Sequence, residues 1–142
     1  MIPTMSSQSE DSSFLTLVLR ILGVDQPEGV SPPVDLIVGG KLPVRVVQLR
    51  NQWILMGTIA TEISNHEESP LLSLLEQASS MWGTLEGTFC YEKKEDILVL
   101  WRNISELREQ ELDPMISRFL EELEFWRTEA FAAGYTGREV FP

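Results

Sequence analysis

The chain has 142 residues, 43% of them hydrophobic, and its 22 acidic and 11 basic side chains give a formal net charge of −11. This length suits one domain with a hydrophobic core, and no apolar run is long enough to span a membrane. The negative charge argues against nucleic acid and anionic membranes as partners, because both repel an acidic surface.

The first predicted element is a helix in "DSSFLTLVLRILG", after a polar stretch, residues 1–10, that we expect to be a flexible leader. Asp11 or Ser12 can cap this helix, and Gly23 can end it. Its apolar residues exceed the single stripe of a surface helix. The helix is therefore either deeply buried or leaves part of a face for a partner, and the pattern leaves both possibilities open.

Three strands are predicted next, at Val34–Gly40, Pro43–Arg50 and Gln52–Ala60. Each is short and rich in the β-branched or apolar residues that strands favour. Because the gaps between them are short, with a tight turn at Arg50 and Asn51, we expect an antiparallel meander.

A second helix and a hairpin follow. Ser69 can cap the helix, Pro70 suits its first position and Gly83 its end. The apolar residues at helical spacing are Leu71, Leu74, Leu75, Ala78 and Trp82. Residues 85–92 alternate in polarity, "EKKED" makes a turn, and "ILVLWRNI" returns as a strand that is apolar on both faces. Such a strand is buried on both sides, and a second copy of the chain could cover one of them.

The closing helix is predicted over 114–130, with Asp113 and Pro114 as its start and 105–111 as a separate turn, because the residue before a proline disfavours helix. Residues 132–142 are expected to be a flexible tail. The elements predict one α+β domain over 11–131, in the order helix, three strands, helix, two strands, helix. We expect a twisted antiparallel sheet with helices packed on it.

Few residues suggest covalent chemistry. Cys90 is the only cysteine and His66 the only histidine, which excludes a disulfide framework and a cysteine-based zinc cluster and favours the reducing cytoplasm. Cys90 is interpreted as a small buried hydrophobe and His66 as a loop residue. Lys41, after two glycines, lacks the spacing of a phosphate-binding loop, so the sequence predicts no nucleotide, cofactor or metal.

Other charged and aromatic residues are interpreted structurally. The acidic pair Glu121 and Glu122 is interpreted as part of a solvated helix face, because adjacent helical positions do not face each other. Tryptophans suit cores as well as the centres of interfaces. The four tryptophans are Trp53, Trp82, Trp101 and Trp126.

Four segments together resemble the class I type III secretion chaperones, the Tir-chaperone-like family of Gram-negative bacteria. "FLTLVLRILGV" resembles the opening helix of the family, "LLSLLEQAS" its middle helix, "GTLEGTFCYEKKEDILVLWRNIS" its hairpin, and "ISRFLEELEFW" its closing acidic helix. The likeness spans about residues 12–130 and consists of apolar periodicity. The chain departs from the family at Gln77-Ala78-Ser79 and in its proline-interrupted first strands.

The resemblance implies a cytoplasmic chaperone, not an enzyme, that binds the N-terminal segment of a type III secreted effector before export, without nucleotide. It also implies a homodimer. On this analogy the partner-binding residues are Phe14, Leu17, Val18, Ile21, Val34, Leu36, Val44 and Val46. The implied dimer-interface residues are Leu75, Trp82, Leu98 and Leu100. For each of these residues, ordinary core packing is the competing interpretation.

Two alternatives remain open at this point. A chaperone-like protein of this fold could instead bind a transcriptional or secretion regulator of the type III system. The chain could also be a small enzyme or an unrelated adaptor, in which case replacing Cys90 or His66 would abolish an activity.

Overall fold

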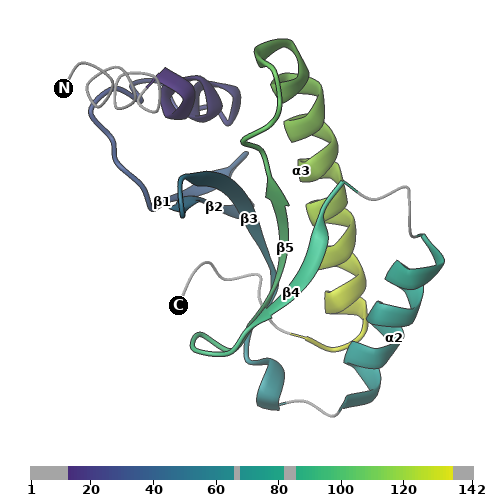
Figure 1. The fold of residues 1–142 in the computed structure, drawn as a ribbon. Helices are drawn as coiled ribbons and strands as arrows, with labels where there is room; N and C mark the ends of the chain where they lie inside the picture. The colour runs from purple at the N-terminus through teal and green to yellow at the C-terminus, as the bar shows by residue number, and fades with distance from the viewer. Residues whose placement is uncertain (1–12, 66–67, 82–85, 136–142) are drawn as a thin grey trace.

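The computed structural model describes residues 13–65, 68–81 and 86–135 (Figure 1). Its first element is a helix described over residues 13–21, here called the N-terminal helix. The elements that follow are β1 (Val34–Val38), β2 (Leu42–Leu49), β3 (Gln52–Ala60), the short 3-10 helix η1 (Ile63–Asn65), α2 (Glu68–Ser80), β4 (Thr88–Glu92), β5 (Ile97–Asn103) and α3 (Glu109–Ala132). This order confirms the predicted α+β fold.

The five strands form one antiparallel sheet in the order β1-β2-β3-β5-β4. The first three strands are a meander, as predicted. The β2–β3 turn is tight, because Arg50 and Asn51 both adopt positive φ angles, 51° and 65°, which suit the twist of a two-residue hairpin. β5 lies between β3 and β4, so β1 and β4 are the two outer strands of the sheet.

The long helix α3 covers one face of this sheet (Figure 1). The closest approach is at Gly57 of β3, where a Cβ atom would lie 2.4 Å from a methyl carbon of Leu123. Val44 and Leu100 pair with Gly57 from the neighbouring strands and lie on the same face. All of these positions are buried, so the core lies between α3 and this face of the sheet.

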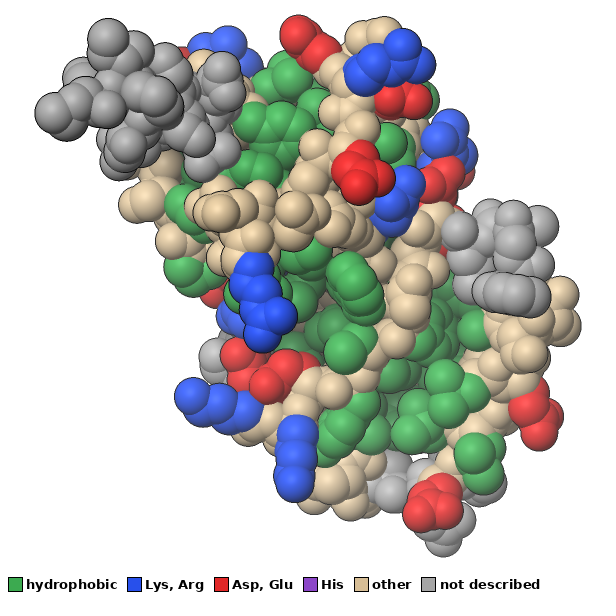
Figure 2. Space-filling view, viewed as in Figure 1, with side chains coloured by type: hydrophobic (Ala, Val, Ile, Leu, Met, Phe, Trp, Pro, Cys, Tyr) green, Lys and Arg blue, Asp and Glu red, His purple; other side chains and the backbone are tan. Residues whose placement is uncertain are grey.

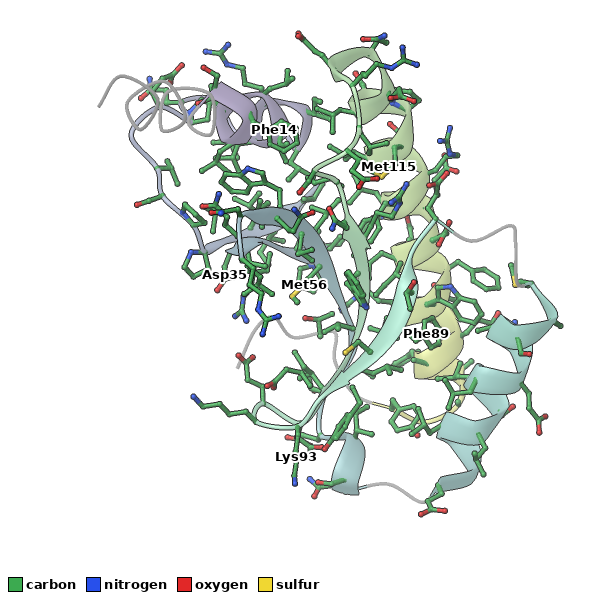
Figure 3. All side chains as sticks on the ribbon, in the orientation of Figure 1. Phe14, Asp35, Met56, Phe89, Lys93 and Met115 are labelled. Carbon is green, nitrogen blue, oxygen red and sulfur yellow. The ribbon has the colours of Figure 1, made fainter. Side chains whose placement is uncertain are left out.

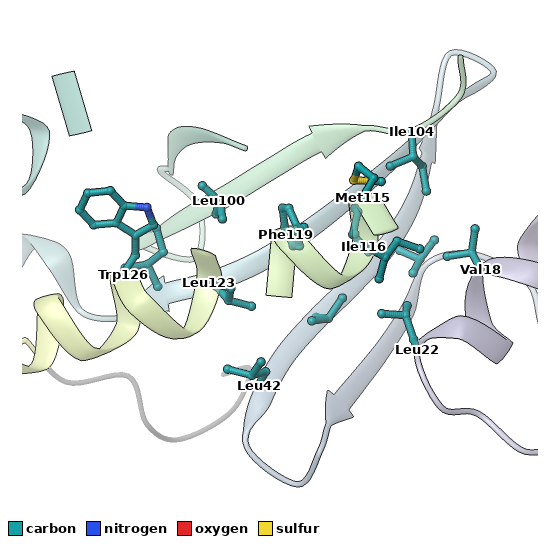
Figure 4. Packing of buried hydrophobic residues seen from close by; sticks show 14 of the residues in the cluster. Val18, Leu22, Leu42, Leu100, Ile104, Met115, Ile116, Phe119, Leu123 and Trp126 are labelled. Carbon is teal, nitrogen blue, oxygen red and sulfur yellow. The ribbon is translucent and has the colours of Figure 1, made fainter. Parts of the chain in front are cut away.

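The N-terminal helix closes one end of that core. Val18 and Leu22 point toward Ile116 of α3 (Figure 4), and the ring of Phe14 lies 5.9 Å from the ring of Trp53 on β3. The helix ends at Gly23, as predicted, because the φ angle of 98° there suits glycine. Its predicted capping residues, Asp11 and Ser12, lie outside the described residues.

The start of α3 differs from the prediction. The helix begins at Glu109 and includes Pro114, so the start at Asp113 and the separate turn over 105–111 are wrong. The Glu111 carboxylate accepts a hydrogen bond from the backbone N–H of Arg108 at 2.9 Å and so caps the helix a turn and a half before the predicted start. Leu112 in this first part is fully buried, and its burial offsets the hydrogen bond that Pro114 removes.

The second helix and the hairpin also differ at their ends. α2 begins at Glu68, one residue before Ser69, and ends at Ser80. The predicted Gly83 end and Leu85 lie outside the described residues. β4 begins at Thr88, because the backbone of Glu86 and Gly87 bonds to α3 instead of to β5. None of the helices that the structure describes is long and apolar enough to cross a membrane.

Candidate partner-binding surface

The predicted partner-binding residues of the N-terminal helix, β1 and β2 all belong to one hydrophobic core cluster or pack against it. On β1, Val34 and Leu36 face the α3 side of the sheet, where they pair with Val46 and Val44 of β2. Their side chains, like those of Phe14, Leu17 and Ile21, are partly buried against the core and keep some exposed area. These five partly exposed apolar residues, which pack against the same core, are here called the helix–β1 surface.

Three of the predicted residues are placed deeper. Val18, Val44 and Val46 have an exposed fraction of 0% and contact only the interior of the chain. Side chains without accessible area cannot contact a partner unless the fold opens. These three residues are therefore part of the core against which the helix–β1 surface packs.

The outer edge of β1 adjoins this surface. Within the described part of the chain, β1 pairs with β2 alone. An outer strand presents N–H and C=O groups that an extended segment from another protein can pair with. The helix–β1 surface therefore combines apolar side chains with an available strand edge.

Charged side chains on the opposite face of β1 are paired with one another. Arg45 of β2 donates two hydrogen bonds to Asp35, at 2.6 and 3.2 Å, and one to Glu95 in the β4–β5 turn, at 3.2 Å. The bond to Asp35 is the main cause that raises the pKa of Arg45 above its ordinary value, while burial lowers it less. Arg45 thus ties the hairpin turn to the sheet, and Ile37 is left as the exposed apolar residue of β1.

A second apolar surface lies on α2. Leu74 faces the core, whereas Leu72 and Leu75 point outward, with exposed fractions of 54% and 41%. Hydrophobic side chains also line the hollow between β4 and α2 (Figure 2). The exposed leucines, here called the α2 ridge, are the part of this surface available to another protein.

Of the three predicted dimer residues that the structure describes, only Leu75 lies on the α2 ridge. Leu75 is exposed, but Leu98 and Leu100 of β5 face α3 and are buried, and Trp82 lies outside the described residues. Helical periodicity identified Leu74 and Leu75 alike as apolar, so it could not separate the inward residue from the outward one. Leu72 was missed because it lies outside the apolar stripe predicted for this helix.

Other apolar residues at the surface were also missed. Phe131 and Phe125 of α3, Tyr91 of β4 and Leu49 of β2 keep large exposed areas, the largest being 56% for Phe131. Phe125 packs edge-on against the buried ring of Trp126. Phe89 of β4, labelled in Figure 3, also packs edge-on against that ring.

The residues that could have suggested chemistry do not gather into a site within the described part of the chain. Cys90 is exposed on β4, so the expectation of a buried hydrophobe is wrong; it lies on an outer strand, on the face that α3 does not cover. His66 lies outside the described residues. Gly39 and Gly40 form the β1–β2 turn with φ angles of 60° and 74°, as predicted. Within the described ranges, no three His, Cys, Asp or Glu side chains gather as a possible metal site.

The interpretation of Glu122 as a solvated residue is also wrong. Glu121 is exposed, but the Glu122 carboxylate is partly buried and accepts hydrogen bonds from the backbone N–H groups of Glu86 and Gly87. Burial is the largest effect on its pKa, which is raised, while the two backbone bonds oppose this shift. The residues just before β4 thus supply hydrogen-bond donors to a carboxylate 35 positions away in sequence.

Solved structures share this fold. The crystal structure of the ExsC–ExsE complex aligns with a TM-score of 0.64 over 84% of this chain and 92% of that chain, at 16% identity. The structure of the HopA1–SchA chaperone–effector complex aligns with a TM-score of 0.65 over 87% of this chain and 97% of that chain, at 18% identity. No curated protein sequence matches the chain significantly.

A family profile matches most of the chain. The profile of the Tir chaperone protein (CesT) family covers residues 13–127, from the N-terminal helix to near the end of α3. This range includes the helix–β1 surface and the α2 ridge. The match confirms the resemblance drawn from the four sequence segments: the chain belongs to the Tir chaperone protein (CesT) family.

Proposed function

We propose that this protein is a cytoplasmic chaperone that binds the N-terminal segment of a type III secreted effector before export, without nucleotide and without covalent chemistry. The helix–β1 surface is the observation that carries this proposal. It combines partly exposed apolar side chains with the outer edge of β1, which pairs with no other strand among the described residues, and an extended peptide can bind to such a surface. The family supports a chaperone role, and one solved structure of this fold is itself a chaperone–effector complex.

The partner segment is held in two ways. Its backbone pairs with the outer edge of β1, and every second side chain turns toward Val34 and Leu36, because strand side chains alternate between faces. The same side chains meet Leu17 and Ile21 of the N-terminal helix. The net charge of −11 helps to keep the unbound protein soluble although apolar side chains are exposed on its surface.

The test compares two aspartate variants of the N-terminal helix. Ile21→Asp puts a charge on the helix–β1 surface, and Ser13→Asp puts the same charge on an exposed position of the same helix. Tagged proteins are used for pull-downs from the native bacterium, with limited proteolysis and mass identification of the protected fragments. Circular dichroism checks that both variants remain folded.

We expect the wild type and Ser13→Asp to protect an N-terminal fragment of a secreted protein, and Ile21→Asp to lose it. An intact, folded regulator in place of the fragment would favour the alternative regulatory role. A fragment that Ile21→Asp retains in full would place the binding surface elsewhere.

We further propose that two copies associate through the α2 ridge. Leu72 and Leu75 are apolar, adjacent on one helix face and exposed in the single chain, as a self-complementary interface requires. Leu75→Asp should convert a dimer to a monomer in sedimentation velocity, whereas Ser73→Asp, on another side of α2, should leave the dimer. A wild-type chain that sediments as a monomer at all concentrations would contradict this proposal. Trp82 stays a predicted member of this interface.

A further inference from the structure

β4 is the second outer strand of the sheet. Within the described ranges it pairs with β5 alone, in an unbroken register from Thr88 to Glu92. The side chains of Thr88, Cys90 and Tyr91 are exposed. Hydrophobic side chains line the hollow between β4 and α2 (Figure 2). The outer edge of β4 therefore lies beside an apolar hollow.

The hydrogen bonds of the sheet show which backbone groups of β5 face β4. The N–H of Ile104, just after β5, donates to the C=O of Trp53 on β3 at 2.9 Å, so the backbone of Ile104 faces β3. The backbone groups of successive residues in a strand point to alternate edges. Every second residue before Ile104 therefore also faces β3, and the backbone groups of Val99 and Trp101 face β4.

The same alternation places the backbone groups of β4. Those two residues of β5 pair with Cys90 and Thr88, whose N–H and C=O groups are therefore used within the sheet. Phe89 and Tyr91 consequently direct their N–H and C=O groups to the outer edge. An extended segment that pairs with β4 must bond to these two residues.

The edge of β4 has little of the protection that outer strands usually have. Such strands commonly carry charged side chains, proline or a bulge, which hinder pairing with another chain. The one charged residue of β4 is Glu92, and its carboxylate accepts the N–H groups of Lys94, at 3.2 Å, and of Glu95 in the β4–β5 turn. Glu92 is thereby directed to its own turn, and the edge at Phe89 and Tyr91 stays available.

A second copy of β4 complements this edge. When two copies lie antiparallel with Cys90 opposite Cys90, Phe89 of each copy lies opposite Tyr91 of the other. The outward N–H and C=O groups of both residues are then paired, and the two copies make the same contacts, as a twofold interface requires. Aromatic pairs across antiparallel strands are favourable, and Glu92 lies opposite Thr88, so like charges do not face each other.

We propose that β4 pairs antiparallel with β4 of a second copy, centred on Cys90, and joins the two sheets into one. This inference rests on the proposed association of two copies and adds a backbone contact to that of the α2 ridge. α2 and β4 border the same hollow (Figure 2), so one copy can contact both elements of the other.

Cross-linking through Cys90, the only cysteine, tests this register. Because the backbone of Cys90 faces β5, the two opposing cysteines form a non-hydrogen-bonded pair, whose Cα atoms lie about 4.5 Å apart. A disulfide spans about 4.4–6.8 Å between Cα atoms. Wild-type protein is oxidised with diamide, and the covalent dimer is measured on a non-reducing gel. A short bismaleimide repeats the measurement without the strict geometry of a disulfide.

An exposed cysteine elsewhere on the same strand is the matched control. In the double variant Thr88→Cys, Cys90→Ser, the cysteine of one copy lies opposite residue 92 of the other, about 13 Å along the strand from its counterpart. We expect the wild type to cross-link at least about tenfold faster than this variant, because thiols held side by side have a high effective concentration. Circular dichroism checks that the variant remains folded.

Sedimentation velocity of the same samples separates this proposal from the one on which it rests. A dimeric wild type that cross-links faster than the control supports pairing through β4. A dimeric wild type that cross-links no faster than the control, with either reagent, overturns pairing through β4 and leaves the α2 ridge as the contact. A monomeric wild type overturns both proposals of association, and the effector-chaperone proposal keeps its own pull-down test.

Discussion

The contact between α3 and the sheet at Gly57 allows a sharp test of how tightly the core is packed. A methyl group at position 57 would lie 2.4 and 2.7 Å from the two methyl carbons of Leu123 and 3.0 Å from its Cγ. Carbon atoms in contact normally lie about 3.5–4.0 Å apart. Gly57→Ala therefore requires Leu123 or the helix to withdraw by about 1 Å.

Leu123 has no exposed area and no solvent to move into. Overpacking of this kind costs about 1–3 kcal/mol of unfolding free energy, which lowers Tm by about 3 °C per kcal/mol in a chain of this size. Leu123→Ala alone leaves a cavity and should cost about 2–5 kcal/mol. In the double variant, the new methyl group occupies part of that cavity. The double should thus be more stable than the sum of the single losses predicts, by at least about 1 kcal/mol.

The assay is urea unfolding followed by far-ultraviolet circular dichroism, at one protein concentration for all variants because association would shift the midpoint. Ser117→Ala, on the exposed side of α3, is the control and should change the free energy by no more than about 0.5 kcal/mol. Additive losses in the double variant, or a Gly57→Ala protein as stable as the wild type, would refute the packing described here.

Three further predictions concern burial and charge. Val18→Asp should prevent stable folding, seen as loss of the cooperative urea transition, because it buries an unpaired charge at a position with no exposed area. Burial raises the pKa of Glu122, so its ionised form is disfavoured in the folded state. The free energy of unfolding of the wild type, relative to that of Glu122→Gln, should therefore be greatest below the pKa that Glu122 has in the unfolded chain, and should fall as pH rises through its pKa in the folded chain. Urea unfolding measured from pH 4 to 7 tests this, and a wild-type midpoint that rises with pH relative to the variant's midpoint would contradict it. A double-mutant cycle between Asp35 and Arg45 should give a coupling free energy of about 0.5–1 kcal/mol, because both side chains remain partly exposed to solvent. A coupling of zero would show that the ion pair does not stabilise the fold.

Local patterns in the sequence were sufficient for the order of elements. Alternating strands, helical apolar spacing and glycines at Gly23, Gly39 and Gly40 each act within a few residues, so they predict elements and turns without knowledge of the rest of the chain. Four such segments in one order also pointed to the family. The start of α3 was the exception, because the hydrogen bond from the Arg108 backbone to Glu111 and the burial of Leu112 outweigh the local rule for the residue before Pro114.

The functional surfaces depended on the tertiary structure. The predicted partner-binding set contained both Ile21 and Val18, and the sequence offered no means to separate the half-exposed residue from the buried one. Periodicity shows that a residue is apolar, but its burial depends on which distant element packs over it. The same applies to Leu98, which is buried on the sheet face that α3 covers, and to Leu75, which stays exposed in the described part of the chain.

By itself, then, the sequence determined the composition of the elements, their order and the family to which they belong, because these follow from short-range geometry and residue type. The tertiary structure alone decided that Cys90 is exposed on an outer strand and that Glu122 binds a backbone 35 residues away. Both features depend on the order of the strands in the sheet and on the position of α3, which bring distant segments of the chain together. A local sequence pattern does not contain this information.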